Sequence, residues 1–194
     1  NIQCCSFGVS LACIDEANRL FQFCLRGVLN QESAHFSREL SFTSQSLFSN
    51  ISKISFHPKK PKILIIFKKF PRNEIIFYNL STKHVIHKKQ LISQTHSFSF
   101  HDQHNVIFLS QSSGTNHFIS IYHLSYDFKK WWRQGRLGLD KSIFEYRNVQ
   151  MKNGLLVATT KTQKLFIWKQ DEIVNSLQKT PSSSSYINGN NLLR

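Results

Sequence analysis

The sequence lacks several features that mark common classes of protein. No uninterrupted apolar run approaches the roughly 20 residues that a membrane-spanning helix needs. No charged segment followed by an apolar core and a small-residue cleavage site indicates secretion. Helical periodicity is nearly absent from the 194 residues. We therefore expect a chain without a transmembrane segment, built mainly from strands.

Signatures of catalysis are also missing. The seven glycines form no phosphate-binding loop, and neither a G-x-S-x-G elbow nor an H-E-x-x-H motif occurs. The paired carboxylates Asp15-Glu16 and Asp171-Glu172 are adjacent in sequence, which is typical of solvated turns. A catalytic pair assembled across strands cannot be read from one sequence. We therefore predict no enzyme, no catalytic residue and no cofactor.

Cysteine is scarce and confined to the amino-terminal end, at Cys4, Cys5, Cys13 and Cys24. The spacing matches no paired C-x-x-C zinc pattern, and adjacent Cys4 and Cys5 point to opposite faces if they lie on a strand. We favour reduced cysteines, with a metal site or a disulfide as the alternatives. Reduced cysteines predict a reducing compartment, the nucleus or the cytoplasm.

Acidic residues are rare in the middle of the chain. Residues 40–139 contain 14 Lys or Arg but only three acids, Glu74, Asp102 and Asp127, and the whole chain has a formal net charge of +14. Such a charge favours nucleic acid, anionic lipid or an acidic protein as a partner, and it says nothing about the fold.

What the sequence does contain is a repeat of short strands. Runs rich in Ile, Phe, Val and Tyr are separated by turns rich in Asn, Gly, Pro and Ser, which predicts an all-β fold. The segment "ISFHPKKPKILIIFKKFPRNEIIFYNLSTKHVIHKK" is echoed by "FSFHDQHNVIFLSQSSGTNHFISIYHLSYDFKKWW". His57 and His101 are 44 residues apart, and so are Tyr78 and Tyr122. Fainter copies place Phe23 before this pair and Trp168 after it.

A period near 44 with four strands per unit is typical of β-propeller blades. The segments "SFHP", "FYNLS", "IYHLS" and "FIWKQ" resemble WD40 repeats, although Asn79, His123 and Lys169 stand where that family usually has Asp after the aromatic residue. The resemblance implies blades of four antiparallel strands and a scaffold that presents loops to partner proteins. About four blades make only part of a ring of the usual seven or eight, and an open arc would leave unpaired strand edges. We favour further blades in the same polypeptide; closure by a partner chain and an unusually small propeller are the alternatives.

The repeat predicts the domain boundaries. Blades are expected at about 1–32, 51–91, 95–134 and 142–177, with a Ser-rich loop insertion at 33–50. Residues 178–194 lose hydrophobicity and gain Ser, Asn and Gly, which predicts a linker or tail.

Histidine is common but does not predict a metal site. His84 and His87 are three residues apart, a spacing that joins residues on a helix face and not on a strand. His101 and His104 bracket a turn with Asp102, but the repeat makes His101 the counterpart of His57. We therefore expect His101 to be structural and predict no metal site.

The basic residues are the candidates for binding. Lys68, Lys69 and Arg72 sit at one turn, whereas "DFKKWWRQGR" combines four cations with two Trp residues that face opposite ways on a strand. Exposed Trp beside Arg suits a protein interface or an unpaired base; solvated lysines and buried indoles are the alternative. The predicted partner-binding residues are Lys68, Lys69, Arg72, Lys129, Lys130, Trp131, Trp132, Arg133 and Arg136.

We predict a non-enzymatic scaffold in an intracellular, nuclear, multiprotein or ribonucleoprotein assembly. The alternatives are direct binding of RNA through the basic loops and binding of phosphoinositides. No Phe-Arg-Arg-Gly motif of the lipid-binding propellers occurs in the sequence.

Overall fold

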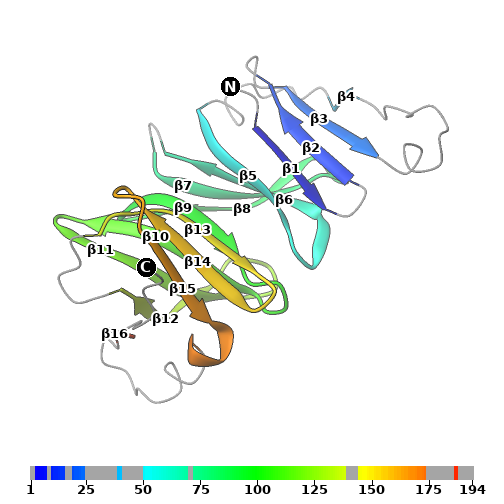
Figure 1. The fold of residues 1–194 in the computed structure, drawn as a ribbon. Coiled ribbons are helices and arrows are strands. Elements are labelled where there is room, and N and C mark those ends of the chain that lie inside the picture. Colours follow the sequence, from blue (N-terminus) through cyan, green and yellow to red (C-terminus); the bar gives the residue numbers. More distant parts are fainter. Residues whose placement is uncertain are drawn as a thin grey trace, which may run out of the picture. The chain divides into compact units, whose positions relative to one another are not determined.

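The computed structural model describes residues 3–7, 10–15, 19–24, 39–40, 50–69, 72–138, 144–173 and 186–187. The described elements are β-strands and one helical turn at 170–173. No helix in these ranges is long and apolar enough to cross a membrane. The chain forms two compact units, Asn1–Gln90 and Leu91–Arg194, whose strands are labelled in Figure 1.

The first unit contains two antiparallel four-stranded sheets. The first sheet has the order β1 (Gln3–Phe7), β2 (Ser10–Ile14), β3 (Leu20–Cys24) and β4 (Glu39–Leu40). The second sheet has the order β5 (Ile51–His57), β6 (Lys60–Lys68), β7 (Glu74–Asn79) and β8 (His84–Gln90). Each strand pairs with the next along the chain, so every connection is a turn or loop at the end of a sheet.

The core of the first unit forms where its two sheets pack. Residues 63–67 of β6 are buried on both faces of the strand, as their continuous apolar run predicts. Ala12, Ile14 and Leu20 of the first sheet share one hydrophobic cluster with side chains of the second, among them Leu64 and Tyr78. Strand β8 is exposed or half-buried along its length, which suits the outer position in its sheet.

The second unit contains one larger and one smaller sheet. The larger sheet has the order β9 (Gln94–Phe100), β10 (Val106–Ser113), β11 (Asn116–Leu124) and β12 (Trp131–Leu137), with β16 (Tyr186–Ile187) parallel to β12. The smaller sheet has the order β13 (Tyr146–Lys152), β14 (Leu155–Thr160) and β15 (Leu165–Lys169). Figure 1 shows β13, β14 and β15 lying across the strands of the larger sheet.

Aromatic and branched side chains fill the space between these two sheets. Phe108 and Ile121 of the larger sheet pack in one cluster with residues of the smaller sheet. In that cluster the Tyr146 ring lies 5.5 Å from Phe166 and 6.2 Å from Trp168, centroid to centroid. Trp168, the aromatic landmark of the fourth repeat copy, is therefore a core residue, 2% exposed.

Two short strands lie in ranges that the sequence predicts to be loop or tail. Strand β4 falls within the expected insertion at 33–50, and β16 falls within the expected tail at 178–194. Each supplies two residues that pair with the edge of a neighbouring strand, β3 and β12 respectively. Two residues are too few to produce an alternating pattern, so the sequence gives no signal for them. The rest of both ranges lies outside the described residues, apart from Asn50.

The same irregularity in strand pairing recurs in two of the repeat copies. In the second sheet a register shift falls between Phe77 and Tyr78, and in the larger sheet of the second unit one falls between Ile121 and Tyr122. The two shifts lie 44 residues apart, immediately before the landmark tyrosines. The outer strand carries one extra residue at each shift, as in a β-bulge. The extra residue in β12 is Gln134, because Ile121 pairs with Gly135 and Tyr122 with Arg133.

The cysteines differ from the expectation of reduced side chains. Cys13 is disulfide-bonded, so the prediction is wrong for this residue. Cys5 is free, and burial raises the pKa of its thiol to about 12. The side chains of Cys4 and Cys24 lie outside the described part of the structure. The support that reduced cysteines gave to a nuclear or cytoplasmic location is therefore weakened.

Candidate interaction surface

A buried histidine closes the turn between β9 and β10. His101 Nδ1 accepts hydrogen bonds from the backbone N–H groups of Gln103, at 2.9 Å, and His104, at 3.3 Å. His57 Nδ1 accepts one from Lys59 N at 3.2 Å in the corresponding turn of the first unit. The prediction that His101 is the structural counterpart of His57 is confirmed. Because Nδ1 accepts, the neutral His101 ring carries its hydrogen on Nε2.

Hydrogen bonds also hold the loop between β11 and β12 in one conformation. Asn105 Nδ2 donates to the carbonyl oxygens of Leu124 and Ser125, both at 2.8 Å, which ties this loop to the β9–β10 turn. Within the loop, Lys130 N donates to Ser125 Oγ at 2.9 Å. Asp127 accepts from Ser125 Oγ and from Lys129 N, and the pKa of its carboxyl is lowered chiefly by the Ser125 hydrogen bond.

The two adjacent indoles have different environments. Trp131 is half-buried, its Nε1 donates to the carbonyl of Phe128 at 2.9 Å, and its ring meets Tyr122 edge-on at 5.7 Å. Trp132 is 50% exposed, and its ring lies 5.9 Å from that of His123. One indole is thus fixed by the fold, and the other offers a large apolar area to solvent.

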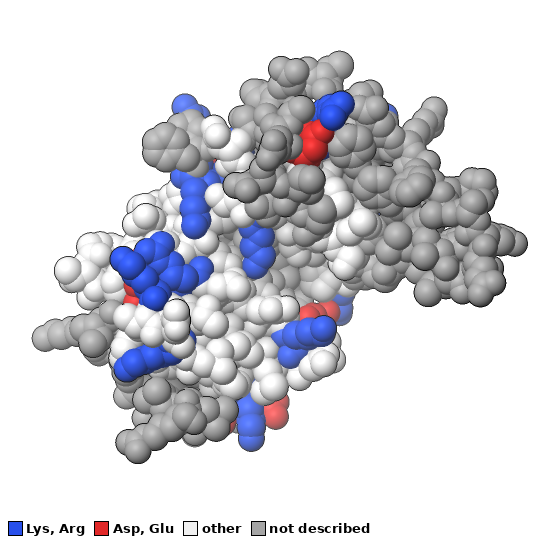
Figure 2. All heavy atoms as spheres, turned by 45° about the horizontal axis from the view of Figure 1, so that its top comes forward, with Lys and Arg blue, Asp and Glu red and all other residues white. Residues whose placement is uncertain are grey.

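Cations flank the exposed indole in the sequence. Lys129, Lys130 and Arg133 are exposed, and Tyr126 on the same loop is 84% exposed. Figure 2 shows Lys and Arg side chains in several separate groups on the visible face, with few acidic side chains among them. We call the exposed residues of this loop and strand the β12 surface: Tyr126, Lys129, Lys130, Trp132 and Arg133.

The remaining predicted site residues lie elsewhere. Arg136 is partly buried, with its guanidinium carbon 4.1 Å from the centre of the Phe118 ring. Lys68, Lys69 and Arg72 belong to the first unit, at the end of β6 and the turn that follows it. Lys69 and Arg72 are exposed, but Lys68 is only 6% exposed. The two sets of candidates thus belong to different units of the chain, and the expectation of an accessible Lys68 is wrong.

Burial changes the chemistry of Lys68. Its pKa is lowered from 10.5, chiefly by desolvation; nearby Glu74 opposes this change and Lys88 adds to it. A buried amine is disfavoured in its charged form. At neutral pH the folded state therefore holds this ammonium at a free-energy cost.

Replacing Lys68 with methionine is expected to raise the free energy of unfolding at neutral pH by up to about 1 kcal/mol, because the buried charge is removed. The lowered pKa fixes the sign of the pH dependence. The free-energy cost of burying the charge is present at any pH at which Lys68 is protonated in both the folded and the unfolded state. It is relieved as the pH rises through the folded-state pKa, because the folded protein then buries a neutral amine. Thermal unfolding at neutral pH and at about pH 10 measures the difference. Lys69→Met at the exposed neighbour is the control, and an equal gain there contradicts the explanation.

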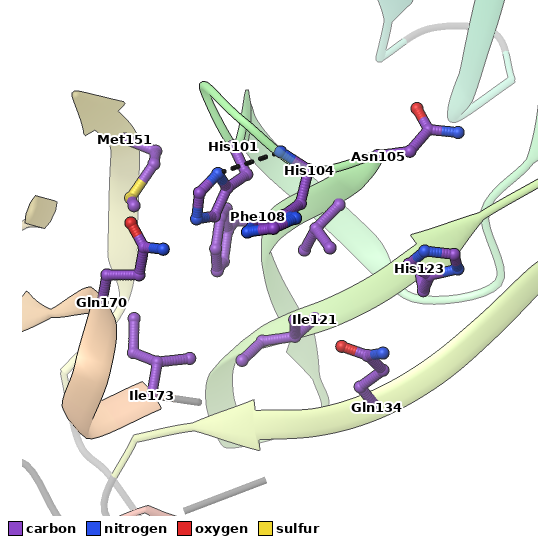
Figure 3. Close-up of a pocket in the computed structure, with 11 residues that line it drawn as sticks. His101, His104, Asn105, Phe108, Ile121, His123, Gln134, Met151, Gln170 and Ile173 are labelled. Atoms are coloured by element: carbon purple, nitrogen blue, oxygen red, sulfur yellow. Dashed lines mark hydrogen bonds between the residues drawn. The ribbon is translucent and has the colours of Figure 1, made fainter. Parts of the chain in front are cut away.

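A pocket lies between the two sheets of the second unit, at the end that carries the β9–β10 turn. Its volume is about 270 Å³. In Figure 3 Met151, Gln170 and Ile173 stand on one side of it, and Ile121, His123 and Gln134 on the other. The lining residues are His101, His104, Asn105, Val106, Phe108, Ile121, His123, Gln134, Met151, Gln170 and Ile173.

No sequence signal identifies this pocket. Its lining comes from β10, β11, β12, β13, the β9–β10 turn and the helical turn at 170–173, and no motif joins these segments. Three histidines line it, yet within the described ranges no group of three or more His, Cys, Asp or Glu side chains could hold a metal ion.

Comparison with known proteins identifies the fold. No family model and no curated protein sequence matches the chain. Among solved structures, a chain of a mitotic checkpoint complex matches with a TM-score of 0.60 and 16% identity over 84% of this chain and 46% of that one. The β-propeller domain of Myceliophteria thermophila Cps50 (Swd1) matches with a TM-score of 0.56 and 8% identity, over 88% and 70% of the two chains. The fold is that of β-propeller blades.

The predictions of an all-β chain and of propeller blades are confirmed. The chain spans about half the length of several propellers that it matches, with 46%, 50% and 43% of those chains covered. One of them is a putative 6-phosphogluconolactonase from Bacteroides uniformis, with a TM-score of 0.56 and 12% identity over 87% of this chain. Propeller blades thus occur in complexes and in a presumed enzyme, and the fold alone does not assign an activity.

Proposed function

We propose that this chain forms part of a non-enzymatic WD40-like propeller that acts as a scaffold for protein–protein interactions. The β12 surface carries the proposal, because it places Trp132 and Tyr126 beside three exposed cations. Aromatic residues and Arg are enriched at the centres of protein interfaces. The hydrogen bonds of the β11–β12 loop fix this surface before binding, which lowers the entropy that a partner must offset.

The proposed partners and cellular location of this scaffold are based on its charge and fold. The net charge of +14 favours acidic protein segments or a ribonucleoprotein as partners. One propeller of similar fold was solved as part of a mitotic checkpoint complex. We place the protein in an assembly in the nucleus or the cytoplasm. The non-enzymatic assignment rests on the lack of catalytic motifs in the sequence.

A paired-variant experiment tests the scaffold proposal. Proteins captured by the full-length protein are identified, purified and titrated against wild type and against the triple variant Trp132→Ala, Lys129→Glu, Lys130→Glu. We expect at least one direct partner to lose tenfold or more in affinity, because the variant removes the aromatic anchor and reverses two charges. The control is Lys59→Glu, Lys161→Glu, which makes the same charge change at exposed sites outside the β12 surface.

Two results contradict the proposal. In one, no direct partner is found, or every partner binds the triple variant and the control equally well. In the other, the full-length protein turns over a substrate and loses that activity when a carboxylate pair is replaced. A partner lost only in the triple variant supports the β12 surface as its binding site.

Direct binding of RNA is the second candidate, because Trp132 is half exposed between cations and could stack on an unpaired base. In this case single-stranded RNA binds with an affinity that falls with salt, with a slope of about 0.7 per phosphate neutralised. Titration of an oligonucleotide at several salt concentrations measures this slope, and absent or salt-insensitive binding rejects the candidate.

A further inference from the structure

We propose that the pocket beside the β12 surface receives one uncharged apolar side chain of an acidic partner peptide bound in an extended conformation. This inference rests on the proposed scaffold function and adds to it the chemistry of the partner and the residues that recognise it.

The floor of the pocket selects an apolar group. Phe108, Ile121, Met151 and Ile173 line it, and each is at most 5% exposed in the folded chain. No Asp, Glu, Lys or Arg side chain is among the lining residues. A charged group that entered would lose its hydration without gaining an ionic partner, which is strongly unfavourable. The floor therefore favours an uncharged apolar side chain.

The size of the pocket favours one side chain over a larger ligand. Pockets for small-molecule ligands are usually about 300 to 1,000 Å³, and this one has about 270 Å³. A branched aliphatic or aromatic side chain is small enough for such a space and gains free energy in proportion to the apolar area that it buries.

The polar lining suits a peptide backbone. Gln134 and His104 are exposed, and Gln170 and His123 are half-buried. A glutamine side chain can donate to a carbonyl and accept from an N–H, which are the groups that an extended peptide presents on its edges. Gln134 and Gln170 stand on opposite sides of the pocket in Figure 3. They can therefore contact the chain on both sides of the inserted residue.

The pocket is built on fixed turns. His101 accepts the two backbone N–H groups that close the β9–β10 turn, and Asn105 ties this turn to the β11–β12 loop. The Phe108 ring stacks on His101 at 6.4 Å. A preformed pocket binds with a smaller loss of conformational entropy than one that must be ordered by its ligand.

The charges around the pocket favour acidic residues beside the inserted side chain. Lys129 and Lys130 lie exposed on the loop tied to the pocket. Arg133 is also exposed, but it pairs with Tyr122 and so lies on the face of the sheet opposite to Ile121 and His123. Three acids at this end each accept a backbone N–H: Asp102 from Asn153, Asp127 from Lys129, and Glu172 from Lys169. These carboxylates cap turns of the fold but keep their charge, and Asp127 lies close enough to Lys129 for the two charges to interact. Asp171 is a further exposed acid near the pocket, so we expect the acidic residues of the peptide on the Lys129 side.

A peptide-display selection tests this inference. A random library is selected on the full-length protein, and the enriched peptides are synthesised with a fluorescent label. We expect them to share one Leu, Ile, Met or Phe flanked by Asp or Glu. Gln134→Trp fills the mouth of the pocket from an exposed position and is expected to weaken their binding tenfold or more. Gln150→Trp, the matched control at an exposed β13 position that does not line the pocket, leaves binding unchanged.

The outcomes separate the pocket from the scaffold function. Enriched peptides that bind Gln134→Trp as tightly as wild type overturn the pocket and leave the scaffold proposal standing. If no peptide is enriched while purified partner proteins still bind, the pocket inference is likewise overturned and the scaffold proposal stands. If an RNA oligonucleotide competes with the peptides and its binding is abolished by Gln134→Trp, the pocket binds a base and the peptide inference is overturned. Loss of peptide binding in Gln134→Trp alone supports the inference.

Discussion

Phe108→Ala is expected to lower the free energy of unfolding by about 3–5 kcal/mol, the usual cost of removing a fully buried aromatic ring. Phe108 is 1% exposed and belongs to the cluster that joins the two sheets of the second unit. Removing its ring leaves a void beside His101 and Ile121, and the surrounding strands can close only part of it because both sheets hold it open. Urea denaturation measures the loss as a lower midpoint at an unchanged slope.

Tyr126→Ala is the control for this substitution. The ring of Tyr126 is also aromatic but 84% exposed, so its removal is expected to change stability by no more than about 0.5 kcal/mol. Equal effects of the two substitutions would mean that the two sheets of the second unit do not pack through Phe108.

His101→Ala is expected to lower the free energy of unfolding by about 1–3 kcal/mol, because the N–H groups of Gln103 and His104 lose their acceptor. His57→Ala removes one equivalent bond, to Lys59, and is expected to have a similar but smaller effect. Thermal and urea unfolding of both variants measures the two losses.

His104→Ala distinguishes the turn-closing role from simple loss of an imidazole ring. The side chain of His104 is exposed, and its backbone N–H still reaches His101 Nδ1 in the variant. We expect a much smaller loss of stability than for His101→Ala. A loss as large as that of His101→Ala would show that ring packing, and not closure of the turn, makes the histidine important.

The repeat made much of the fold predictable from the sequence. The 44-residue spacing of His57 and His101 and of Tyr78 and Tyr122 reflects equivalent places in two successive sheets, because the hydrogen bonds of the histidines and the register shifts at the tyrosines recur. The middle strands keep this spacing less strictly. Tyr78 pairs with Leu64, and Tyr122 pairs with Ile107. These two partners are 43 residues apart and not 44, because the turns on either side of them differ in length by one residue. Landmarks at strand ends were therefore better guides than residues inside strands.

The candidate site was predictable only in part. The sequence identified the strand with Trp131 and Trp132 and its cations, because aromatic and basic residues are dense there. The sequence does not predict that Lys68 is buried, because a lysine at the end of an apolar strand is expected to lie in an exposed turn. It also gave no sign of the pocket, because Gln134, Met151 and Gln170 come together only when the two sheets pack.

The extra residue in β12 decides which of the two indoles meets a partner. Strict alternation counted back from buried Leu137 would put Trp131 on the same face as Leu137 and Trp132 on the opposite one. The bulge at Gln134 reverses this parity, so Trp132 shares a face with His123 and Ile121, beside the pocket. A relative of this chain with the same two indoles but without the bulge would present the other ring there. In comparing such proteins, the residue count between Leu137 and the indoles is therefore more informative than the presence of the Trp pair itself.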